Sequence, residues 1–355
     1  MPLHPSPATD QTPTPLLSLT FEELETFILK LGLKRYRVKQ ILSWIYQGQI
    51  RDFKQMTDLS ILDRLLLSKK LTLPLLQIIT HQKSEDGTEK FLFQLDDGNQ
   101  IESVLIPEER RNTLCISSQA GCTLDCSFCL TAQGKLKRNL KSDEIINQIL
   151  TIQNRLPEER RITNVVLMGM GEPLANLASV TKALEWMVSP FGFGFSPRRI
   201  TVSTAGLVPQ MRQFWQGPVP VNLSISLNAT TDKTRDQLMP KTNRLYPLKE
   251  LLSVCRMTTL PARRQITFEY VLLSGVNDSL EDAERLAKLT RGIQCKINLI
   301  PFNEYPSSPY RRPSEEMILQ FQDHLHHAGR RTLIRKSRGR DIFAACGQLS
   351  TQGQK

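Results

Sequence analysis

The chain has 355 residues, and its 46 Lys and Arg against 35 Asp and Glu give a formal net charge of +11. Hydrophobic residues make up 40%, enough for a large core, but no apolar run approaches the roughly 20 residues of a membrane helix, which excludes a transmembrane protein. The charge favours a polyanionic partner, RNA or DNA first, with a merely basic soluble protein as the alternative. Seven cysteines, three of them close together, do not fit the disulfide framework of a secreted scaffold. A cytoplasmic location is therefore expected.

The N-terminal residues 1–17 are rich in Pro and Thr and lack the basic start and apolar stretch of a secretory signal, so a disordered leader is expected. Between residues 18 and 76 apolar residues recur at helical spacing, which predicts a small helical, RNA-binding domain. Its short basic connector, 32–37, suits a helix-hairpin-helix element that contacts phosphates, or simply a solvated loop between two packed helices.

Residues 77–107 predict a β-hairpin linker, because apolar runs at 91–95 and 101–106 flank the turn sequence Asp96-Asp-Gly-Asn. Beyond residue 110, β-rich runs alternate with longer helical stretches, which is typical of a parallel sheet. The strands are expected at 113–117, 164–168, 199–203, 221–227, 265–272 and 296–300. The helices are expected at 142–153, 177–187, 248–256, 280–290 and 314–327, with a last strand at 332–336.

Six β/α units are too few for a complete eight-fold barrel, so the fold class expected for residues 108–341 is α/β, a partial (β/α)6 barrel. Its site is expected among the loops at the carboxyl ends of the strands. Residues 342–355 form a tail.

Three cysteines stand out in the sequence Gly121-Cys122-Thr-Leu-Asp-Cys126-Ser-Phe-Cys129, directly after the first core strand. A structural zinc would need a fourth ligand, and the nearest downstream histidine is His324. Three thiolates on a [4Fe–4S] cluster instead leave one iron open to a small molecule. The spacing therefore favours the cluster, with zinc or plain buried thiols as the alternatives.

A second motif, Met168-Gly-Met-Gly171-Glu172-Pro-Leu, follows the second strand. Its glycines allow a ligand to approach the backbone, and the Glu172 carboxylate can accept a hydrogen bond from an ammonium group. Polar groups also follow later strands, and each alone is more often a helix cap or turn. Their recurrence at one end of successive strands predicts a cofactor rim. These groups are Ser203, Ser226, Asn228 and Asn303.

Two more cysteines lie apart from the motif, Cys115 on the first core strand and Cys346 in the tail. Cysteine is commonly buried as a small hydrophobe, so the residue type alone assigns both to the core, together with Cys255 and Cys295. Cys346 differs because it follows the basic segment 335–340, whose charges lower a thiol pKa and attract phosphate.

The cysteine spacing resembles that of the radical S-adenosylmethionine (SAM) superfamily. Combined with Cys115-Ile-Ser-Ser-Gln-Ala-Gly, Ser203-Thr-Ala-Gly and Ala345-Cys-Gly-Gln-Leu, it resembles the RlmN family of radical SAM RNA methyltransferases over nearly the whole chain. The resemblance implies methylation of adenine C2 in 23S rRNA and in the tRNA anticodon loop. It further implies an electron donor such as flavodoxin or ferredoxin, and a monomer that needs no membrane.

The resemblance also implies residue roles. Cys122, Cys126 and Cys129 would hold the [4Fe–4S] cluster. Cys346 would carry a methyl group, Cys115 would close a transient disulfide with it, and Glu102 would act as the base, although periodicity alone places Glu102 on the surface of a hairpin strand. Two SAM molecules per turnover are implied, because C2 is too electron-poor for direct methyl transfer. The SAM contacts would be Gly171, Glu172, Ser203, Ser226, Leu227, Asn228 and Asn303.

The sequence departs from the family pattern at Asn228, where several relatives have His, and at Lys135, where Gly is common. Cations beside the cysteines, a further pair at 198–199 and the basic segment 335–340 before Cys346 are expected to contact RNA, although a charge run is more often a solvated face. The cations of the first two groups are Lys135, Lys137, Arg138, Lys141, Arg198 and Arg199. Two alternatives stay open, a Cfr-like methyltransferase acting on adenine C8 and a non-catalytic iron–sulfur protein that binds RNA.

Overall fold

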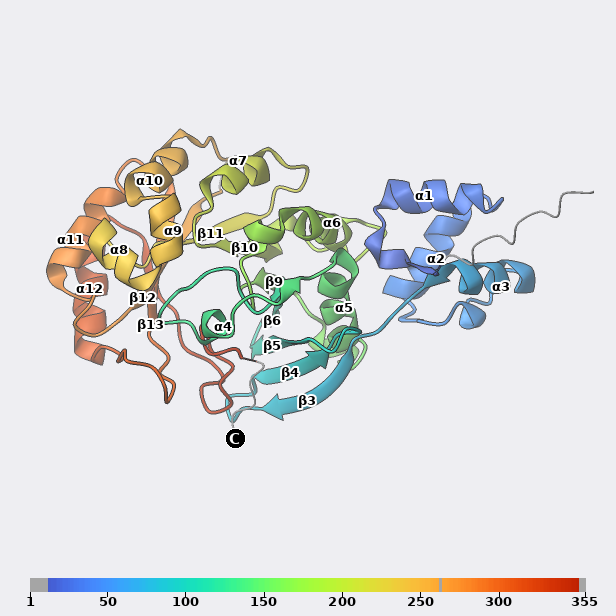
Figure 1. Ribbon diagram of the computed structural model, residues 1–355, viewed down its shortest axis with the longest axis horizontal. Coiled ribbons are helices and arrows are strands. Elements are labelled where there is room, and N and C mark those ends of the chain that lie inside the picture. Colours follow the sequence, from blue (N-terminus) through green and yellow to red (C-terminus); the bar gives the residue numbers. More distant parts are fainter. Residues whose placement is uncertain (1–11, 262–263, 351–355) are drawn as a thin grey trace, which may run out of the picture.

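A small helical lobe is joined to a larger α/β lobe in the computed structural model, which describes residues 12–261 and 264–350 (Figure 1). One sheet of ten strands runs through the larger lobe in the order β14-β13-β12-β11-β10-β9-β6-β5-β4-β3. Within these described ranges, no helix has the length and apolar character needed to cross a membrane.

The small lobe contains α1 (Phe21–Lys30), α2 (Tyr36–Tyr46) and α3 (Ile61–Lys70), which confirms the predicted helical segment. α1 begins at Thr20 because the Thr20 side chain accepts from the backbone N–H of Glu23, while the Glu23 carboxylate accepts from that of Thr20. Buried apolar residues on each helix form the core of the lobe. These include Leu24, Ile28, Val38, Ile41, Leu42, Ile45 and Leu67.

The expected disordered leader is wrong for its last residues, and residues 1–11 lie outside the described residues. β1 (Thr14–Pro15) pairs in parallel with β2 (Leu71–Thr72), and the next two residues, Leu16 and Leu17, are buried in the core. The Pro- and Thr-rich composition hides this short apolar pair, whose burial ties the segment down.

The two lobes contact each other through α6 (Leu177–Val188) of the larger lobe. The indole N–H of Trp186 donates to the carbonyl oxygen of Leu19 over 2.8 Å, and Lys182 Nζ lies 2.9 Å from a carboxylate oxygen of Glu23. These contacts seat the small lobe against the outside of the barrel.

The first strands of the sheet are antiparallel: β3 (Gln77–Lys83), β4 (Glu89–Gln94), β5 (Gln100–Glu108) and β6 (Arg111–Cys115). The β4–β5 hairpin was predicted, and its turn has Gly98 at φ +82°, which favours glycine. β3 was not predicted, because nearly all its residues are exposed and no apolar alternation marks it. The hairpin was predicted as a linker, but its strands continue the barrel sheet.

The remaining strands are parallel, as predicted, and form a partial barrel with helices outside (Figure 1). They are β6, β9 (Asn164–Leu167), β10 (Ile200–Thr204), β11 (Asn222–Ser226), β12 (Ile266–Leu272), β13 (Cys295–Pro301) and β14 (Thr332–Ile334). The helices are α5 (Ser142–Gln153), α6, α7 (Val208–Gln216), α8 (Asp232–Leu238), α9 (Pro240–Leu245), α10 (Leu248–Met257), α11 (Leu280–Leu289) and α12 (Glu315–His327). Short elements are β7 (Gln119–Ala120), β8 (Arg138–Asn139), α4 (Leu130–Gln133), η1 (Leu16–Ser18), η2 (Phe53–Gln55), η3 (Glu158–Arg160), η4 (Pro173–Asn176) and η5 (Pro197–Arg199).

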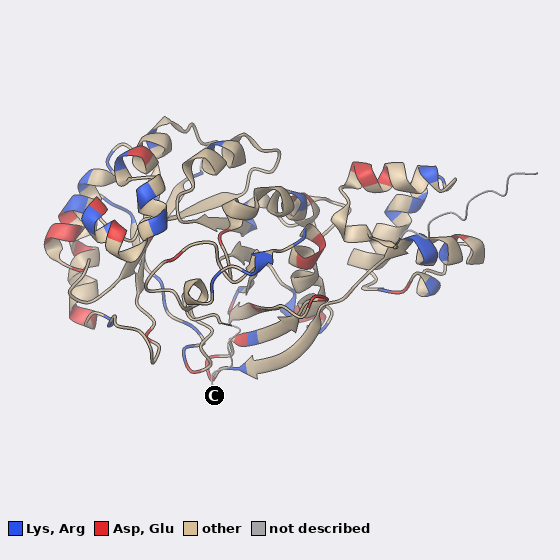
Figure 2. Cartoon of the chain, in the orientation of Figure 1, with Lys and Arg blue, Asp and Glu red and all other residues tan. Residues whose placement is uncertain are grey.

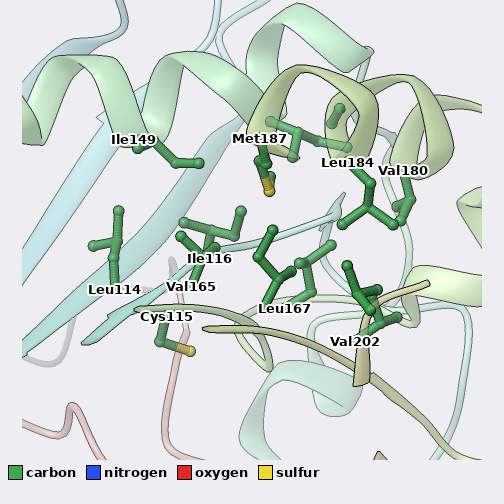
Figure 3. Packing of buried hydrophobic residues seen from close by; sticks show 14 of the residues in the cluster. Leu114, Cys115, Ile116, Ile149, Val165, Leu167, Val180, Leu184, Met187 and Val202 are labelled. Atoms are coloured by element: carbon green, nitrogen blue, oxygen red, sulfur yellow. The ribbon is translucent and has the colours of Figure 1, made fainter. Parts of the chain in front are cut away.

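Alternation along β6 separates the core from the barrel interior. Leu114 and Ile116 point toward the covering helices, where Ile149 of α5 and Met187 of α6 lie, whereas Cys115 points to the opposite face of the sheet (Figure 3). Successive side chains of a strand point to opposite faces, so this strand brings a thiol into the barrel while anchoring itself with its neighbours.

Candidate active site

The cysteine loop, residues 121–129, connects β7 to α4. β7 and β8 pair on either side of it, which fixes both of its ends. Gly121 has φ +79°, and a Cβ there would lie 1.8 Å from the carbonyl oxygen of Lys135. Only glycine fits this close approach of two backbone segments.

The three thiols of this loop lie within electrostatic reach of one another, and Cys126 and Cys129 pack against an apolar cluster. Burial, followed by the neighbouring Cys129 and Cys122, raises the pKa of Cys126 well above its ordinary value. Apolar residues of α8 and its C-terminus, Leu238 and Met239, belong to the cluster that packs here. Three converging soft ligands with no fourth protein ligand fit a [4Fe–4S] cluster that leaves one iron open.

The spacing of these thiols is also compatible with a cluster. In the described part of the chain, no three His, Cys, Asp or Glu side chains are gathered closely enough to hold a single metal ion. In a [4Fe–4S] cluster each thiolate binds a different iron, so the sulfurs need not meet around one ion.

The predicted SAM rim lies at the carboxyl ends of β9 to β13. Gly171 has φ +100°, and a Cβ there would lie 2.5 Å from Cβ of Gln119, so the glycine is required. Glu172 is buried, and its carboxylate accepts from the backbone N–H groups of Ala205 (2.8 Å) and Leu174 (3.0 Å). Burial raises the pKa of Glu172 to about 7, although these bonds oppose the rise. Each carboxylate oxygen keeps a lone pair for an ammonium donor.

The other rim residues differ in what they can offer a ligand. Ser203 and Ser226 are half-buried, and Leu227 is fully buried. Asn228, at φ +57°, already uses its side chain, since Oδ1 accepts from the N–H of Val271 over 2.9 Å. Oδ1 of Asn303 is buried and has no hydrogen-bond partner within the described part of the chain, which suits a donor on a bound ligand.

The tail brings Cys346 across the cysteine loop. The N–H of Leu130 donates to the carbonyl oxygen of Gly347 over 2.8 Å, and the Thr131 hydroxyl donates to that of Leu349 over 2.7 Å. The predicted SAM rim also contacts the tail, because Asn303 Nδ2 donates to the carbonyl oxygen of Cys346 over 3.2 Å.

A second set of bonds ties the start of the tail to the turn between β3 and β4. Ser84 Oγ donates to Asp341 Oδ1 over 2.6 Å, and the N–H of Gly339 donates to Asp86 Oδ2 over 2.9 Å. We call these bonds the hairpin–tail contact. Burial raises the pKa of Asp86, but hydrogen bonds from Thr88, Gly339 and Ser84 outweigh it and lower the pKa to about 2.

The two distant cysteines share one cavity of about 530 Å³ inside the barrel, whose lining also includes Asn303, Glu269 and Arg335. Burial, and then the nearby Cys346, raise the pKa of the Cys115 thiol to about 12, and Arg335 opposes the rise. The pKa of Arg335 is itself raised, chiefly by Cys346. A guanidinium thus lies within electrostatic reach of both thiols and opposes the rise in the pKa of Cys115.

Glu102 is buried, so the surface position that periodicity favours is wrong. It lies on β5 two residues before Val104, which is paired with Cys115, so Glu102 and Cys115 share one face of the sheet. Lys90 Nζ lies 3.2 Å from Oε1 of Glu102, and Oε2 accepts from the N–H of Ser350 over 2.8 Å. Burial raises the pKa of Glu102, and the charge of Lys90 opposes this.

Comparison with known proteins bears on the chain as a whole. Residues 14–72 match the family model described as Ribosomal RNA large subunit methyltransferase N-terminal domain, and residues 116–289 match the Radical SAM superfamily. The protein named Dual-specificity RNA methyltransferase RlmN of Geobacter sulfurreducens is 52% identical over 331 residues, 93% of this chain and 90% of that protein. The protein of the same name from Geotalea uraniireducens is 50% identical over 332 residues, 94% of this chain and 95% of that protein.

The chain belongs to the RlmN family of radical SAM methyltransferases. The crystal structure of a radical SAM methyltransferase from Sphaerobacter thermophilus has the same fold, with a TM-score of 0.90 and 43% identity, covering 95% of this chain and 99% of that one. Membership of the radical SAM superfamily brings a [4Fe–4S] cluster and SAM as cofactors.

Among the cations predicted to contact RNA, some are paired with carboxylates in the structure, and others line the barrel cavity. Arg138 is engaged, because it forms ion pairs with Asp97 and with Glu144. Lys and Arg residues occur on both lobes (Figure 2). The barrel cavity is lined by several of them, of which Arg111 and Lys296 were not predicted. The cavity cations are Arg111, Arg199, Lys296, Arg335, Lys336 and Arg338.

Proposed function

We propose that this chain methylates C2 of an adenine in 23S rRNA and in the anticodon loop of tRNA, and consumes two SAM molecules per turnover. The observation that carries the proposal is that Cys115 and Cys346 line one cavity. The tail that contains Cys346 is hydrogen-bonded to Leu130, directly after the cysteine loop. Cys122, Cys126 and Cys129 would hold the cluster. The SAM contacts would be Gly171, Glu172, Ser203, Ser226, Leu227, Asn228 and Asn303.

In the first half of the reaction, the Cys346 thiolate takes the methyl group of SAM by displacement at carbon and stores it as a thioether. Arg335 lines the same cavity as Cys346, which places a positive charge in the chamber where the transfer occurs. The hydrogen bond from Asn303 to the Cys346 carbonyl holds the tail in place.

In the second half, a carbon–carbon bond forms between the stored methyl carbon and the base. The bound cluster and a second SAM supply one-electron chemistry strong enough to remove a hydrogen atom from an unactivated methyl group. The unpaired electron is then on the methylene carbon that is bonded to the Cys346 sulfur. This carbon adds to C2 of the adenine, which ties the RNA covalently to the protein.

Release of the RNA uses the two remaining residues. Glu102 removes the C2 proton, and the one electron that the ring radical must lose to become aromatic again would be taken up by the oxidised cluster that Cys122, Cys126 and Cys129 would hold. The Cys115 thiolate then attacks the Cys346 sulfur, the sulfur–carbon bond breaks, and the carbon takes up a proton to become the methyl group. The resulting disulfide must be reduced by an external two-electron donor before the next turnover.

The target adenine must leave its stack to enter the cavity, which favours single-stranded loops over duplex. The lining cations Arg199 and Lys296 are suited to its phosphates, whereas Arg111 is ion-paired with Glu108. The basic connector of the small lobe, residues 32–37, is suited to flanking RNA. A cytoplasmic monomer served by flavodoxin or ferredoxin completes the proposal. The domains would be residues 18–76 for RNA binding, 77–107 for the hairpin, 108–341 for the core and 342–355 for the carrier tail.

Mass spectrometry of nucleosides tests this proposal. RNA incubated with the reconstituted protein, SAM and a reductant is expected to yield 2-methyladenosine. Cys346→Ala is expected to abolish the product, whereas Cys255→Ala, in a cysteine buried away from the cavity, is expected to keep it. Formation of 8-methyladenosine would replace the proposal by the C8 reaction, and unchanged product with Cys346→Ala would refute the carrier.

A further inference from the structure

Glu269 is a buried carboxylate in the barrel that the proposed mechanism does not use. It lies on β12 and is 4% exposed. Its Oε1 accepts two hydrogen bonds, from Ser224 Oγ over 2.5 Å and from Asn298 Nδ2 over 3.1 Å. Oε2 is buried and has no hydrogen-bond partner among residues 12–261 and 264–350. A buried acceptor is rarely left unpaired, and the exceptions are found where a ligand completes the pairing.

The position of Glu269 shows where such a ligand would come from. Glu269 lines the same cavity as Cys115 and Cys346. Its two existing donors come from the neighbouring strands β11 and β13, so they fix the carboxylate in place. The Arg335 guanidinium is within electrostatic reach. Glu269 is therefore a fixed carboxylate in the wall of the reaction chamber, and one of its oxygens still has the capacity to accept a hydrogen bond.

We propose that Oε2 of Glu269 accepts a hydrogen bond from the exocyclic N6 amine of the target adenine and selects this base. The inference rests on the proposed function, because it takes adenine as the base that enters the cavity. Adenine presents N–H donors at N6, whereas guanine and hypoxanthine present a carbonyl oxygen at the same position. Two acceptors facing each other repel, so the carboxylate would reject these 6-oxo purines.

The size of the effect follows from the burial of this oxygen. A site built to pair with a substrate N–H discriminates strongly against an analogue without it, because the protein group is then left buried and unpaired. A loss of at least about tenfold in kcat/KM is expected for a purine without the amine.

The experiment compares two substrates and two variants. The substrates are identical RNA stem–loops with either adenine or unsubstituted purine, which lacks the amine, at the target position. The variants are Glu269→Gln and, as a matched control, Glu284→Gln on the exposed face of α11. Methylation of Cys346, which needs no RNA, is measured on each protein. The rates of RNA methylation are then compared per mole of protein with methylated Cys346.

We expect Glu269→Gln to lower kcat/KM for the adenine RNA by at least about tenfold and for the purine RNA by less than about threefold. The ratio of the two losses cancels any difference in the reactivity of C2 between the bases. Glu284→Gln is expected to behave as the wild type on both. Equal losses on the two substrates would overturn the inference, because they would show a structural role for Glu269.

A second measurement covers the case in which Glu269→Gln does not fold. The wild-type protein alone is then compared on adenine, purine and hypoxanthine RNA, with adenine expected to react fastest and hypoxanthine slowest. Similar rates on all three would overturn the inference while leaving the proposed function in place. Failure of the wild-type protein to methylate the adenine RNA would overturn the proposed function itself, and the inference with it.

Discussion

Asn303 Nδ2 donates a hydrogen bond to the main-chain oxygen of Cys346 over 3.2 Å, which joins the end of the last barrel strands to the tail. The other end of the same amide, Oδ1, is buried and no described residue pairs with it. One side chain thus links the predicted SAM rim with the residue that would receive the methyl group.

Replacement of Asn303 by Ala is therefore expected to slow the methylation of Cys346. Loss of one hydrogen bond costs about 1 kcal/mol, which corresponds to a loss in rate of roughly fivefold. The measurement is the mass of the protein after timed incubation with SAM. Asn99→Ala, in the exposed hairpin turn, is the control, and an unchanged rate with Asn303→Ala would contradict the proposed link.

Replacement of Cys115 by Ala is expected to trap the RNA on the protein. Without a second thiol, the sulfur–carbon bond to Cys346 is not broken, so the tether accumulates. Denaturing gel electrophoresis with labelled RNA measures the adduct. Cys295→Ala is the control, since Cys295 lies outside the cavity lining. Turnover without an adduct in Cys115→Ala would refute the assigned role.

Resolution of the tether is expected to depend on pH through Glu102. Burial raises the pKa of Glu102 above its ordinary 4.5, so the carboxylate takes up its proton at a higher pH than a surface Glu does. The rate in a single turnover is expected to fall as the pH falls through this raised value. For stability the sign is opposite, because a raised pKa favours the folded protein below the unfolded value and this contribution is lost as the pH rises.

Lys90 provides the sharper test of this pH dependence. The charge of Lys90 lowers the pKa of Glu102. Lys90→Met is therefore expected to move the acid limb of the pH–rate profile, the pH range in which the single-turnover rate falls, upward by about 1 pH unit. Lys83→Met, on the exposed edge strand β3, is expected to leave the limb in place. An acid limb at the same pH in Lys90→Met and wild type would exclude Glu102 as the group that titrates.

The hairpin–tail contact is expected to control the mobility of the tail. Asp341→Ala removes the acceptor for Ser84, so amide hydrogen exchange in residues 342–350 is expected to rise about tenfold, together with a loss of turnover. Asp97→Ala, in the opposite turn of the hairpin, is the control. Because the pKa of Asp86 is about 2, stability from its hydrogen bonds is present above the unfolded value of 3.8 and lost as the pH falls through about 2. Exchange in the wild type that rises between pH 7 and 5 would speak against this assignment.

Gly121→Ala is expected to prevent the cysteine loop from closing. A Cβ at this position would lie 1.8 Å from the carbonyl oxygen of Lys135, so the two segments must separate. Iron content after reconstitution is expected to fall by more than about half, in line with a local strain of several kcal/mol. Gly98→Ala isolates the cost of a positive φ, because Gly98 is at +82° with open space around it. Equal iron in both variants would show that the overlap is relieved elsewhere.

The sequence predicted the parallel strands and the helices α5, α6, α10, α11 and α12, because each of these carries its own periodicity, whereas α7, α8 and α9 were not predicted. α5 begins and ends where its apolar spacing and flanking polar residues indicate, and the parallel strands are short apolar runs bounded by turns. Edge and surface elements were missed for the converse reason. β3 exposes most of its residues, and α8 is a short polar helix in which few apolar positions mark a buried face.

The candidate site was predictable only where its residues are adjacent in sequence. The cysteine loop and the glycine-rich strand end are local motifs, whereas the burial of Glu102 depends on Lys90 and on a tail residue 248 positions away. Likewise, nothing near Glu269 in the sequence indicates that one of its oxygens lacks a partner. Both features arise when distant strands and the tail come together in the folded sheet. A local sequence pattern carries no information about such contacts.

The bond between Ser84 and Asp341 spans 257 positions, so it has consequences for the order in which the molecule assembles. Contacts between segments so distant in sequence form late in folding, since the loss of chain entropy must first be offset by nearer contacts. The tail is then laid over a barrel that already exists, and the cysteine loop beneath it stays open in the meantime. We expect an iron–sulfur donor to reach the three thiols during that interval. The cluster would then be in place before the tail brings Cys346 into the cavity.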